Sequence, residues 1–496
     1  MSTVIGLDIG TTSTIALLMR PDGEVLASAS RASRLYSPEP GFAEADPEQW
    51  WQNASEVLGE VMAAHAEARD VRGICVTGML PAVVIVDADG EVLHRSLQQS
   101  DARCGREVAE LAEELDEARF LARTGQGLTQ QLVAPKLRWL ARHEPAAFAR
   151  IACVFGSYDY INWRLTDETT VERNWALEAG FVDLADHAIA DDLVALSGLS
   201  SEVLPRLVSA HEVVGRVSAA AAAATGLPVG CPVMGGAADH IASALAAGLT
   251  RSGDVLLKFG GAGDIIAIAP HPEPDRRLFL DYHLVPGLYA PNGCMASSGS
   301  LLRWLAGLIG TDGSDDGLLA RLDAEAAAIE PGAGGVRLLP YFLGEKTPIH
   351  DPQARGTLTG LSLGHTRGHI WRAALEAIAC GFRHHLDVFV DSGRPVTRLI
   401  ASDGGSRSRV WMQIVADICG APVNVLADAS GSALGAAWVA AVGLGLAHWQ
   451  DVSAKAAIGT VIEPHPAHCA ASEAVYRDYR ALYSALTPFF NREVKA

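Results

Sequence analysis

The sequence lacks the features that mark membrane-spanning and secreted proteins. Its longest apolar stretch, residues 433–447, is interrupted by glycines and is shorter than a membrane span. The eight cysteines are scattered between Cys75 and Cys469, without the spacing typical of metal sites. The chain begins Met1-Ser2-Thr3 and enters an apolar run at once, so no signal peptide is visible. We therefore expect a cytoplasmic protein whose thiols are reduced and buried.

Basic residues are also in short supply. The chain has 39 lysines and arginines against 58 aspartates and glutamates, which gives a net charge of −19. This excess argues against nucleic acid or an anionic membrane as a partner. With 496 residues, 49% of them hydrophobic, the chain is too long for one ordinary domain and has ample material for a core. We expect at least two large domains.

The opening residues predict a β-hairpin with a glycine turn. Apolar residues 4–7 lead to Asp8, residues 10–14 read Gly-Thr-Thr-Ser-Thr, and apolar residues 15–18 follow. Glycine lets the backbone approach a ligand closely, and the hydroxyls and N–H groups after it can hold phosphate. Asp8, at the strand end, could hold Mg²⁺ directly or through water. A plain β-turn with a surface aspartate is the alternative.

The same theme recurs about half a chain later. Residues 254–259 predict a strand, residues 260–264 a glycine turn, and residues 265–269 the returning strand. Two such copies indicate two related α/β domains, with a boundary near residues 247–253. A nucleotide between these domains would have one glycine turn on each side.

Other segments predict helices and a third glycine turn. Asp46 is expected as the N-cap of a helix that begins at Pro47, with Gln49 three residues after the cap. Residues 402–408, Ser-Asp-Gly-Gly-Ser-Arg-Ser, stand between a predicted strand at 398–401 and a helix from Val410. A flat ring or a phosphate can pack on such a turn.

Two polar groups suggest a substrate site. Asp239 follows Gly235-Gly236 and falls in the first turn of a helix, where it could accept a proton from a substrate hydroxyl. Capping of that helix is the alternative. Asp101 and Arg103 could bind the hydroxyls of a polyol, with an ordinary surface ion pair as the alternative.

Together these segments resemble the FGGY family of carbohydrate kinases over nearly the whole chain. Residues 6–13 are similar to the family's first phosphate motif, and residues 404–408 to its adenosine motif. Further segments that resemble family signatures lie at residues 134–140, 159–166, 344–356 and 365–376.

The resemblance implies a fold and a reaction. The fold would be α/β, with two ribonuclease-H-like domains of the actin and hexokinase ATPase type around a nucleotide cleft. Residues 1–246 would form the sugar-binding and catalytic domain, and residues 247–496 the nucleotide-binding domain. The protein would be an ATP-dependent kinase that phosphorylates a primary hydroxyl of a ketose, such as the pentulose D-xylulose. A small-molecule sugar would be its partner, and a homodimer is left open.

The resemblance also assigns residues. Asp239 would be the catalytic base and Asp8 the carboxylate associated with Mg²⁺. The sugar would contact Leu80, Pro81, Asp101, Arg103 and Asp239. ATP and its phosphates would contact Gly10, Thr11, Thr12, Ser13, Gly260, Gly261, Gly404, Gly405 and Ser406.

The chain departs from the pattern of the family's xylulokinases near the sugar. Pro81 stands where those enzymes have a histidine, and it donates no hydrogen bond. Gln99-Ser100 replaces Trp-Asn before Asp101, and the second glycine turn lacks the usual Gly-Thr-Ser. Another ketose or a polyol is therefore an alternative substrate. A non-catalytic sugar or nucleotide sensor and an actin-like or chaperone-like ATPase are alternative functions.

Overall fold

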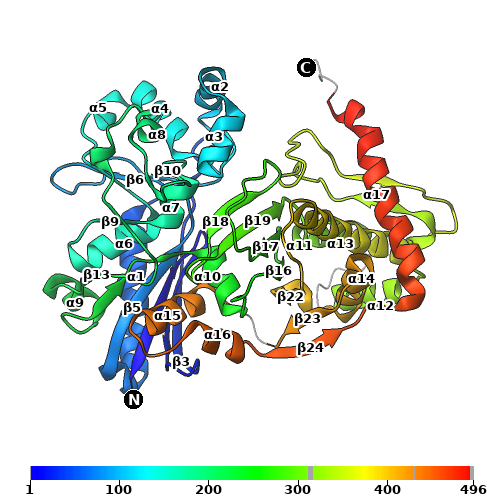
Figure 1. The fold of residues 1–496 in the computed structure, drawn as a ribbon. Helices are drawn as coiled ribbons and strands as arrows, with labels where there is room; N and C mark the ends of the chain where they lie inside the picture. Colours follow the sequence, from blue (N-terminus) through cyan, green and yellow to red (C-terminus); the bar gives the residue numbers. More distant parts are fainter. Residues whose placement is uncertain (1, 311–316, 428–430, 492–496) are drawn as a thin grey trace. The chain divides into compact units, whose positions relative to one another are not determined.

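The computed structural model describes residues 2–310, 317–427 and 431–491, and these form two compact units (Figure 1). The first unit contains residues 1–250, 270–290 and 430–456. The second contains residues 251–269, 291–429 and 457–496. These units are defined by contacts and each takes in several chain segments, so the domain boundary at residues 246 and 247 remains a prediction.

The first unit is built on a mixed sheet with the strand order β13-β14-β5-β1-β2-β3. The predicted opening hairpin is confirmed: β1 and β2 are antiparallel, and β3 continues the antiparallel run. Strand β5 pairs in parallel with β1 and with β14. The strands are β1 (Thr3–Ile9), β2 (Ser13–Met19), β3 (Val25–Ala32), β5 (Val71–Gly78), β13 (Val213–Arg216) and β14 (Pro232–Met234).

The second unit repeats this pattern in the order β19-β17-β16-β22-β23-β24. Its first three strands are antiparallel, β22 and β23 are parallel to β16 and to each other, and β24 is antiparallel at the edge. The duplication predicted from the two glycine turns is thus present in the sheets. The strands are β16 (Asp254–Phe259), β17 (Gly263–Ala267), β19 (Tyr289–Met295), β22 (Arg398–Ser402), β23 (Val423–Leu426) and β24 (Ile458–Ile462).

Helix α1 (Pro47–Ala64) packs against β2 and β3. Its predicted start is confirmed, because Asp46 occupies the N-cap and its side chain accepts a hydrogen bond from the Glu48 N–H at 3.0 Å. Gln49, three residues after the cap, binds elsewhere and does not close a capping box. Its side-chain oxygen accepts from the Arg34 N–H at 2.9 Å, so it joins the helix to the chain that follows β3.

Helix α15 (Ser432–Gly443) comes from the C-terminal half of the sequence but packs against β1, β5 and helix α10 (Asp239–Ala246) in the first unit. Small residues permit this close packing. A β-carbon on Gly435 would lie 2.0 Å from the carbonyl oxygen of Ala242, which is far inside van der Waals contact.

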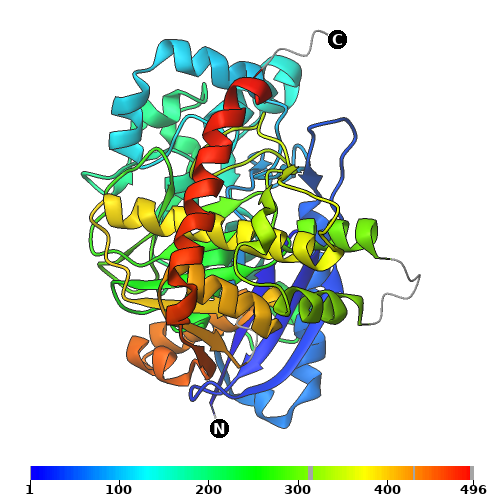
Figure 2. The ribbon, with the colours of Figure 1, turned by 90° about the vertical axis from the view of Figure 1, so that its right-hand side faces the viewer.

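The helices of the second unit include α12 (Leu318–Ala327), α13 (Arg367–Asp391), α14 (Arg409–Cys419) and α17 (Cys469–Phe490). Helix α13 packs against α12, α14 and α17, and its buried residues extend along nearly its whole length. Figure 2 shows α17 in red, crossing the yellow α13. Helix α14 begins at the residue before the predicted Val410, with Ser408 as its capping residue.

The remaining elements are short strands and helices, among them β15, which pairs in parallel with β5. Those of the first unit are β4 (Glu44–Ala45), β6 (Val84–Val86), β7 (Ser96–Leu97), α2 (Gly105–Glu114), α3 (Glu117–Thr124), α4 (Val133–His143), α5 (Pro145–Phe148), β8 (Cys153–Phe155), α6 (Ser157–Thr166), β9 (Thr170–Glu172), α7 (Arg173–Glu178), β10 (Val182–Asp183), β11 (Ala188–Ile189), α8 (Asp191–Ala195), β12 (Arg206–Val208), α9 (Ala219–Thr225), β15 (Ala237–Ala238), β18 (Phe279–Tyr282) and α16 (Trp449–Lys455). The second unit adds α11 (Gly299–Ile309), β20 (Arg337–Leu339) and β21 (Thr357–Thr359).

All eight cysteines are free thiols, and only Cys469 is exposed. Burial raises the pKa of Cys104 to about 11, so this thiol is inert at neutral pH. No helix in the described part of the chain has the length and apolar character that a membrane crossing requires.

Candidate active site

The carboxyl ends of three neighbouring strands bring the predicted catalytic residues of the first unit together. Strand β5 pairs in parallel with β1 on one side and with β15 on the other. In this register Asp8 is opposite Thr77, and Ala238 is opposite Gly78. Asp8 at the end of β1 and Asp239, directly after β15, therefore emerge at the same edge of the sheet. Loops at the carboxyl ends of parallel strands are the usual place for ligands in such sheets.

Asp8 is a buried carboxylate that is held in place by its neighbour. Asp8 is only 7% exposed, and its Oδ1 accepts a hydrogen bond from the Thr77 hydroxyl at 2.8 Å. A carboxylate oxygen oriented by a second side chain is a suitable ligand for Mg²⁺. The surface aspartate that the sequence left as an alternative is excluded by this burial.

The turn after Asp8 offers N–H groups. The Gly10 N–H donates to the Ser13 carbonyl at 2.9 Å and closes the turn. Within residues 2–310, 317–427 and 431–491, the exposed N–H groups of Thr11 and Thr12 donate to no protein acceptor. A β-carbon on Gly10 would lie 3.6 Å from Asp8 Oδ2, so the turn is next to the carboxylate. Free N–H groups beside a possible metal ligand fit phosphates of a nucleotide.

Asp239 is the first residue of α10, and its side chain is 36% exposed. Its Oδ1 accepts hydrogen bonds from the His240 N–H at 2.6 Å and from the His240 ring at Nδ1, 3.4 Å away. The N-cap position belongs to Ala238, whose side chain caps nothing. Asp239 therefore caps the helix only through the hydrogen bond that its Oδ1 accepts from the His240 N–H. Among the described residues, no group donates to Oδ2, which leaves this oxygen for a substrate hydroxyl.

Asp101 and Arg103 form a buried pair, so the surface ion pair considered as an alternative is wrong. Their side chains are 0% and 1% exposed. Asp101 Oδ1 accepts from Arg103 Nε at 2.9 Å, and Oδ2 accepts from Arg103 Nη2 at 2.8 Å and from the Ala43 N–H at 2.7 Å. Arg103 also donates to Glu44 at 2.7 Å and covers the ring of Phe42. The contact of this pair with a sugar remains a prediction.

Leu80 and Pro81 follow β5 at the same sheet edge and are buried. The loop is fixed by Ser157, whose hydroxyl donates to the Met79 carbonyl at 2.7 Å. Met79 also contacts the first turn, since its sulfur accepts a weak hydrogen bond from Thr11 Oγ1 at 3.7 Å. The predicted sugar loop and the predicted phosphate turn are therefore joined directly.

In the second unit, the carbonyl groups of the turn at Gly260 and Gly261 accept hydrogen bonds from the start of α11. The Gly260 carbonyl accepts from the Gly299 N–H at 2.9 Å, and the Gly261 carbonyl accepts from the Ser298 N–H at 2.9 Å. A β-carbon on Gly299 would lie 2.5 Å from the Gly260 oxygen, so only glycine fits there. In the described residues, the N–H groups of residues 260–262 have no protein acceptor. This turn also fits phosphate.

The third turn follows β22 and lies beside the second. Strand β22 is parallel to β16, with Ser402 opposite Lys258. A β-carbon on Gly405 would lie 2.5 Å from the Trp411 ring, which explains the glycine by packing. Gly404 has open space around it, and Ser406 is buried, with its hydroxyl donating to the Asp403 carbonyl at 2.7 Å.

Sequence reasoning missed Asp403, Glu178, His240 and Asp281 as residues of interest. Asp403 has φ 72° and ψ −177°, a conformation found almost only for glycine, and strained backbone of this kind clusters at functional sites. A β-carbon on Gly260 would lie 3.6 Å from its Oδ2, so its carboxylate faces the second turn. His240 could have been noted as the neighbour of Asp239. Nothing in the local sequence singles out Glu178 or Asp281.

The comparisons with known proteins agree with this geometry. The model of the FGGY family of carbohydrate kinases, N-terminal domain, matches residues 3–246, and that of the C-terminal domain matches residues 266–444. The chain belongs to the FGGY family of carbohydrate kinases. It is an ATP-dependent sugar kinase, and the predicted fold of two α/β domains of the actin and hexokinase ATPase type is confirmed.

Similar proteins carry related names. The chain is 31% identical to the xylulose kinase of Klebsiella pneumoniae over 441 residues, which cover 88% of this chain and 89% of that one. It is 30% identical to the xylulose kinase of Bacillus subtilis (strain 168) over 448 residues, 90% of this chain and 89% of the other. A solved structure of xylulose kinase from Rhodospirillum rubrum is 59% identical, with a TM-score of 0.95 and coverage of 99% and 100%.

Proposed function

We propose that the protein transfers the γ-phosphoryl group of ATP to a primary hydroxyl of a pentulose, with D-xylulose as the first candidate. The observation that carries this proposal is the meeting of Asp8 and Asp239 at one sheet edge, on either side of β5. One carboxylate suits a metal-bound phosphate and the other a proton from the acceptor hydroxyl. The choice of a pentulose is supported by the similar xylulose kinases.

In this proposal Asp239 is the catalytic base. Its Oδ1 is occupied by His240, so Oδ2 accepts the proton of the sugar hydroxyl as that oxygen attacks. Its partial exposure lets a hydroxyl approach, and its place in the first turn of α10 puts its negative charge at the positive end of the helix dipole.

Asp8 would hold Mg²⁺, which when bound neutralises charge on the transferred phosphate. The oriented, buried carboxylate and the adjoining N–H groups of Thr11 and Thr12 fit this role. We propose Gly10 to Ser13, Gly260 and Gly261 as phosphate contacts, and Gly404, Gly405 and Ser406 as contacts of the adenosine part. The free N–H groups of the first two turns support the phosphate assignments.

We keep Leu80, Pro81, Asp101 and Arg103 as the proposed sugar side of the site. Asp101 and Arg103 bind each other through hydrogen bonds. We therefore propose that they act on the sugar indirectly, by fixing the backbone of the site. The Ala43 N–H on Asp101 holds the segment before α1 in place. Leu80 and Pro81 would supply apolar surface and shape instead of hydrogen bonds.

We also propose a cytoplasmic location, supported by ATP as substrate and by the eight free thiols. A homodimer is a further proposal, which light scattering of the purified protein tests directly.

A coupled assay of ADP release tests the reaction. The panel contains D-xylulose, other ketopentoses, ketohexoses and polyols of four and five carbons, each with ATP and Mg²⁺, and a sample without sugar. Turnover that requires a ketopentose supports the proposal. No turnover with any sugar indicates a sensor, and equal turnover without sugar indicates an ATPase of another kind; either result contradicts the proposal. Highest kcat/KM with a polyol or ketohexose would move the substrate to that class.

A further inference from the structure

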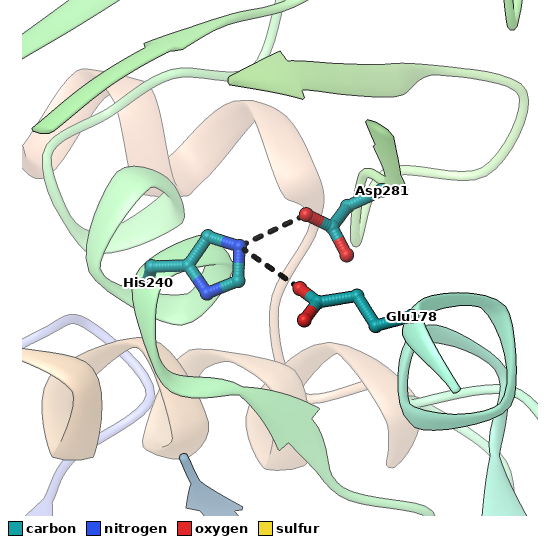
Figure 3. Close-up of side chains that lie close together, drawn as sticks. All are labelled: Glu178, His240 and Asp281. Carbon is teal, nitrogen blue, oxygen red and sulfur yellow. Dashed lines mark hydrogen bonds and ion pairs between the residues drawn. The ribbon is translucent and has the colours of Figure 1, made fainter. Parts of the chain in front are cut away.

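A histidine and two carboxylates form a cluster in the first unit that the proposed reaction does not use. Glu178 ends α7, His240 is the second residue of α10, and Asp281 lies in β18 (Figure 3). His240 Nε2 lies 2.9 Å from Asp281 Oδ2 and 3.9 Å from Glu178 Oε1. The Asp281 side chain is fully buried, and those of Glu178 and His240 are 15% and 22% exposed.

The ring of His240 joins this cluster to Asp239. Figure 3 shows the Nε2 edge of the ring turned toward both carboxylates. The opposite nitrogen, Nδ1, lies 3.4 Å from Asp239 Oδ1, and the His240 N–H binds the same oxygen at 2.6 Å. The order is therefore Asp281, imidazole, Asp239.

Three such side chains could also hold a metal ion, but the distances favour a hydrogen bond. Ligands of a tetrahedral ion with bonds of about 2.0–2.1 Å lie about 3.3 Å apart. Nε2 and Asp281 Oδ2 are 2.9 Å apart, the usual length of a charge-assisted hydrogen bond. Nε2 therefore faces Asp281 as a donor.

Donation from both ring nitrogens requires a protonated imidazole. Burial alone would lower the pKa of His240, but Asp281, Asp239 and Glu178 raise it well above the usual range. Burial raises the pKa of Glu178 far above its usual value, and the charge of Asp281 raises it further. The ring of His240 therefore lies between two carboxylates, those of Asp281 and Asp239.

We propose that His240 is a positioning residue for the catalytic base: it fixes Asp239 Oδ1, so that Oδ2 faces the sugar hydroxyl, and is itself fixed by Asp281 and Glu178. The arrangement follows the logic of catalytic triads, in which a buried carboxylate sets the orientation of an imidazole. This inference rests on the proposed role of Asp239 as the base.

Two substitutions of His240 separate positioning from folding. The amide nitrogen of His240→Asn replaces Nδ1 beside Asp239, whereas that of His240→Gln replaces Nε2 beside Asp281. We expect His240→Gln to lower kcat by about 10- to 100-fold with little change in the KM for ATP, as expected for a misplaced catalytic group. His240→Asn should retain several-fold more activity than His240→Gln. Asp183→Asn, which breaks a different ion pair, that with Arg123, is the matched control and should keep kcat within about twofold.

Circular dichroism and thermal unfolding establish that each variant is folded. Equal kcat for folded His240→Asn, His240→Gln and the wild type would overturn the inference. Stoichiometric Zn²⁺ binding in calorimetry, lost in His240→Asn, would overturn it as well, because Nε2 would then be a ligand. Asp239→Asn tests the proposed catalytic base separately. If this variant keeps near-normal turnover, the proposed base is wrong, whatever the His240 variants do.

Discussion

Gly6 lies so close to Ala433 that a β-carbon at position 6 would be 1.8 Å from the Ala433 carbonyl oxygen. Strand β1, which leads to Asp8 and the Gly10 turn, is therefore packed backbone against backbone with helix α15. Position 6 requires glycine because there is no space for a side chain, and not because its φ is positive.

Gly6→Ala should destabilise the first unit by about 3 kcal/mol or more, because neither backbone can move without breaking the sheet or the helix. Urea unfolding followed by circular dichroism measures the change. Gly307→Ala is the matched control: it lies inside α11 with open space around it, and should stabilise the protein by about 0.5–1 kcal/mol. Equal stabilities for the two variants would contradict the packing argument.

Asp8→Ala should lower kcat by about 10²-fold or more and raise the Mg²⁺ concentration needed for half-maximal turnover, because a metal ligand is lost. Initial rates across a Mg²⁺ titration test this. Thr77→Val, which removes only the hydroxyl that orients Asp8, should show a smaller shift in the same direction. A Mg²⁺ dependence unchanged in Asp8→Ala, with normal activity, would make Asp8 a residue of the turn alone.

Asp403→Gly should stabilise the second unit by about 1–3 kcal/mol, since the backbone conformation at φ 72° and ψ −177° is strained for any side chain. Asp167→Gly is the control, because Asp167 has φ 65° and ψ 7°, a left-handed conformation that aspartate tolerates better. Chemical unfolding of both variants decides: a gain no larger for position 403 than for position 167 would refute the strain.

The same Asp403→Gly variant can be assayed with ATP. If its carboxylate contributes to the nucleotide site beside Gly260, the KM for ATP should change while the KM for the sugar does not. Unchanged constants for both substrates would limit Asp403 to a structural role.

Buried His385 should make stability depend on acid. Burial lowers its pKa to about 4, and its neutral ring binds the Gly381 carbonyl through Nδ1 at 2.8 Å and the Thr347 hydroxyl through Nε2 at 2.8 Å. The unfolded chain takes up a proton near pH 6.5 and the folded chain does not. Stability is therefore complete above pH 6.5 and falls as the pH drops toward 4, by about 3 kcal/mol.

Unfolding free energies of the wild type and His385→Gln, measured from pH 7 to pH 4, test this dependence. The slope with pH should be smaller in the variant. His143→Gln, which replaces an exposed histidine, should keep the wild-type slope. Parallel curves for wild type and His385→Gln would show that this ring does not carry the effect.

Pro81→His should raise kcat/KM for D-xylulose relative to other ketopentoses, because a site that pairs a sugar hydroxyl discriminates against analogues that lack it. Pro81 is buried in the loop after β5, so the new ring must face the sugar side to have this effect. Kinetics of the wild type and the variant on the same ketopentoses measure the ratio. If D-xylulose already has clearly the highest kcat/KM in the wild type, proline is a neutral replacement for histidine.

The elements with local causes were predictable from the sequence. The alternation in residues 3–19 and the N-cap at Asp46 depend on neighbours within a few positions, and both are present. The repeated glycine turn in the sequence predicted that the two sheets would have similar strand arrangements. The motif at Asp239 placed this residue correctly at the first turn of a helix.

Features that depend on distant contacts were not predictable in this way. Glu178 and Asp281 reach His240 only because α7 and β18 pack together, and no local pattern encodes that. The burial of Asp101 depends on Ala43 and Glu44, which come before helix α1 and are far from Asp101 in the sequence. The positive φ of Asp403 is set by the turn around it and has no signature in the residue type, since glycine is the residue expected there.

The membership of α15 in the first unit has a consequence for the order of folding. The face of β1 that contains Gly6 is covered by residues made after most of the second unit has been synthesised. On the ribosome, the first unit thus cannot complete its core until residue 443 has left the exit tunnel. A fragment that ends at residue 246 would keep its motifs but expose an apolar sheet face, and it would be prone to aggregation.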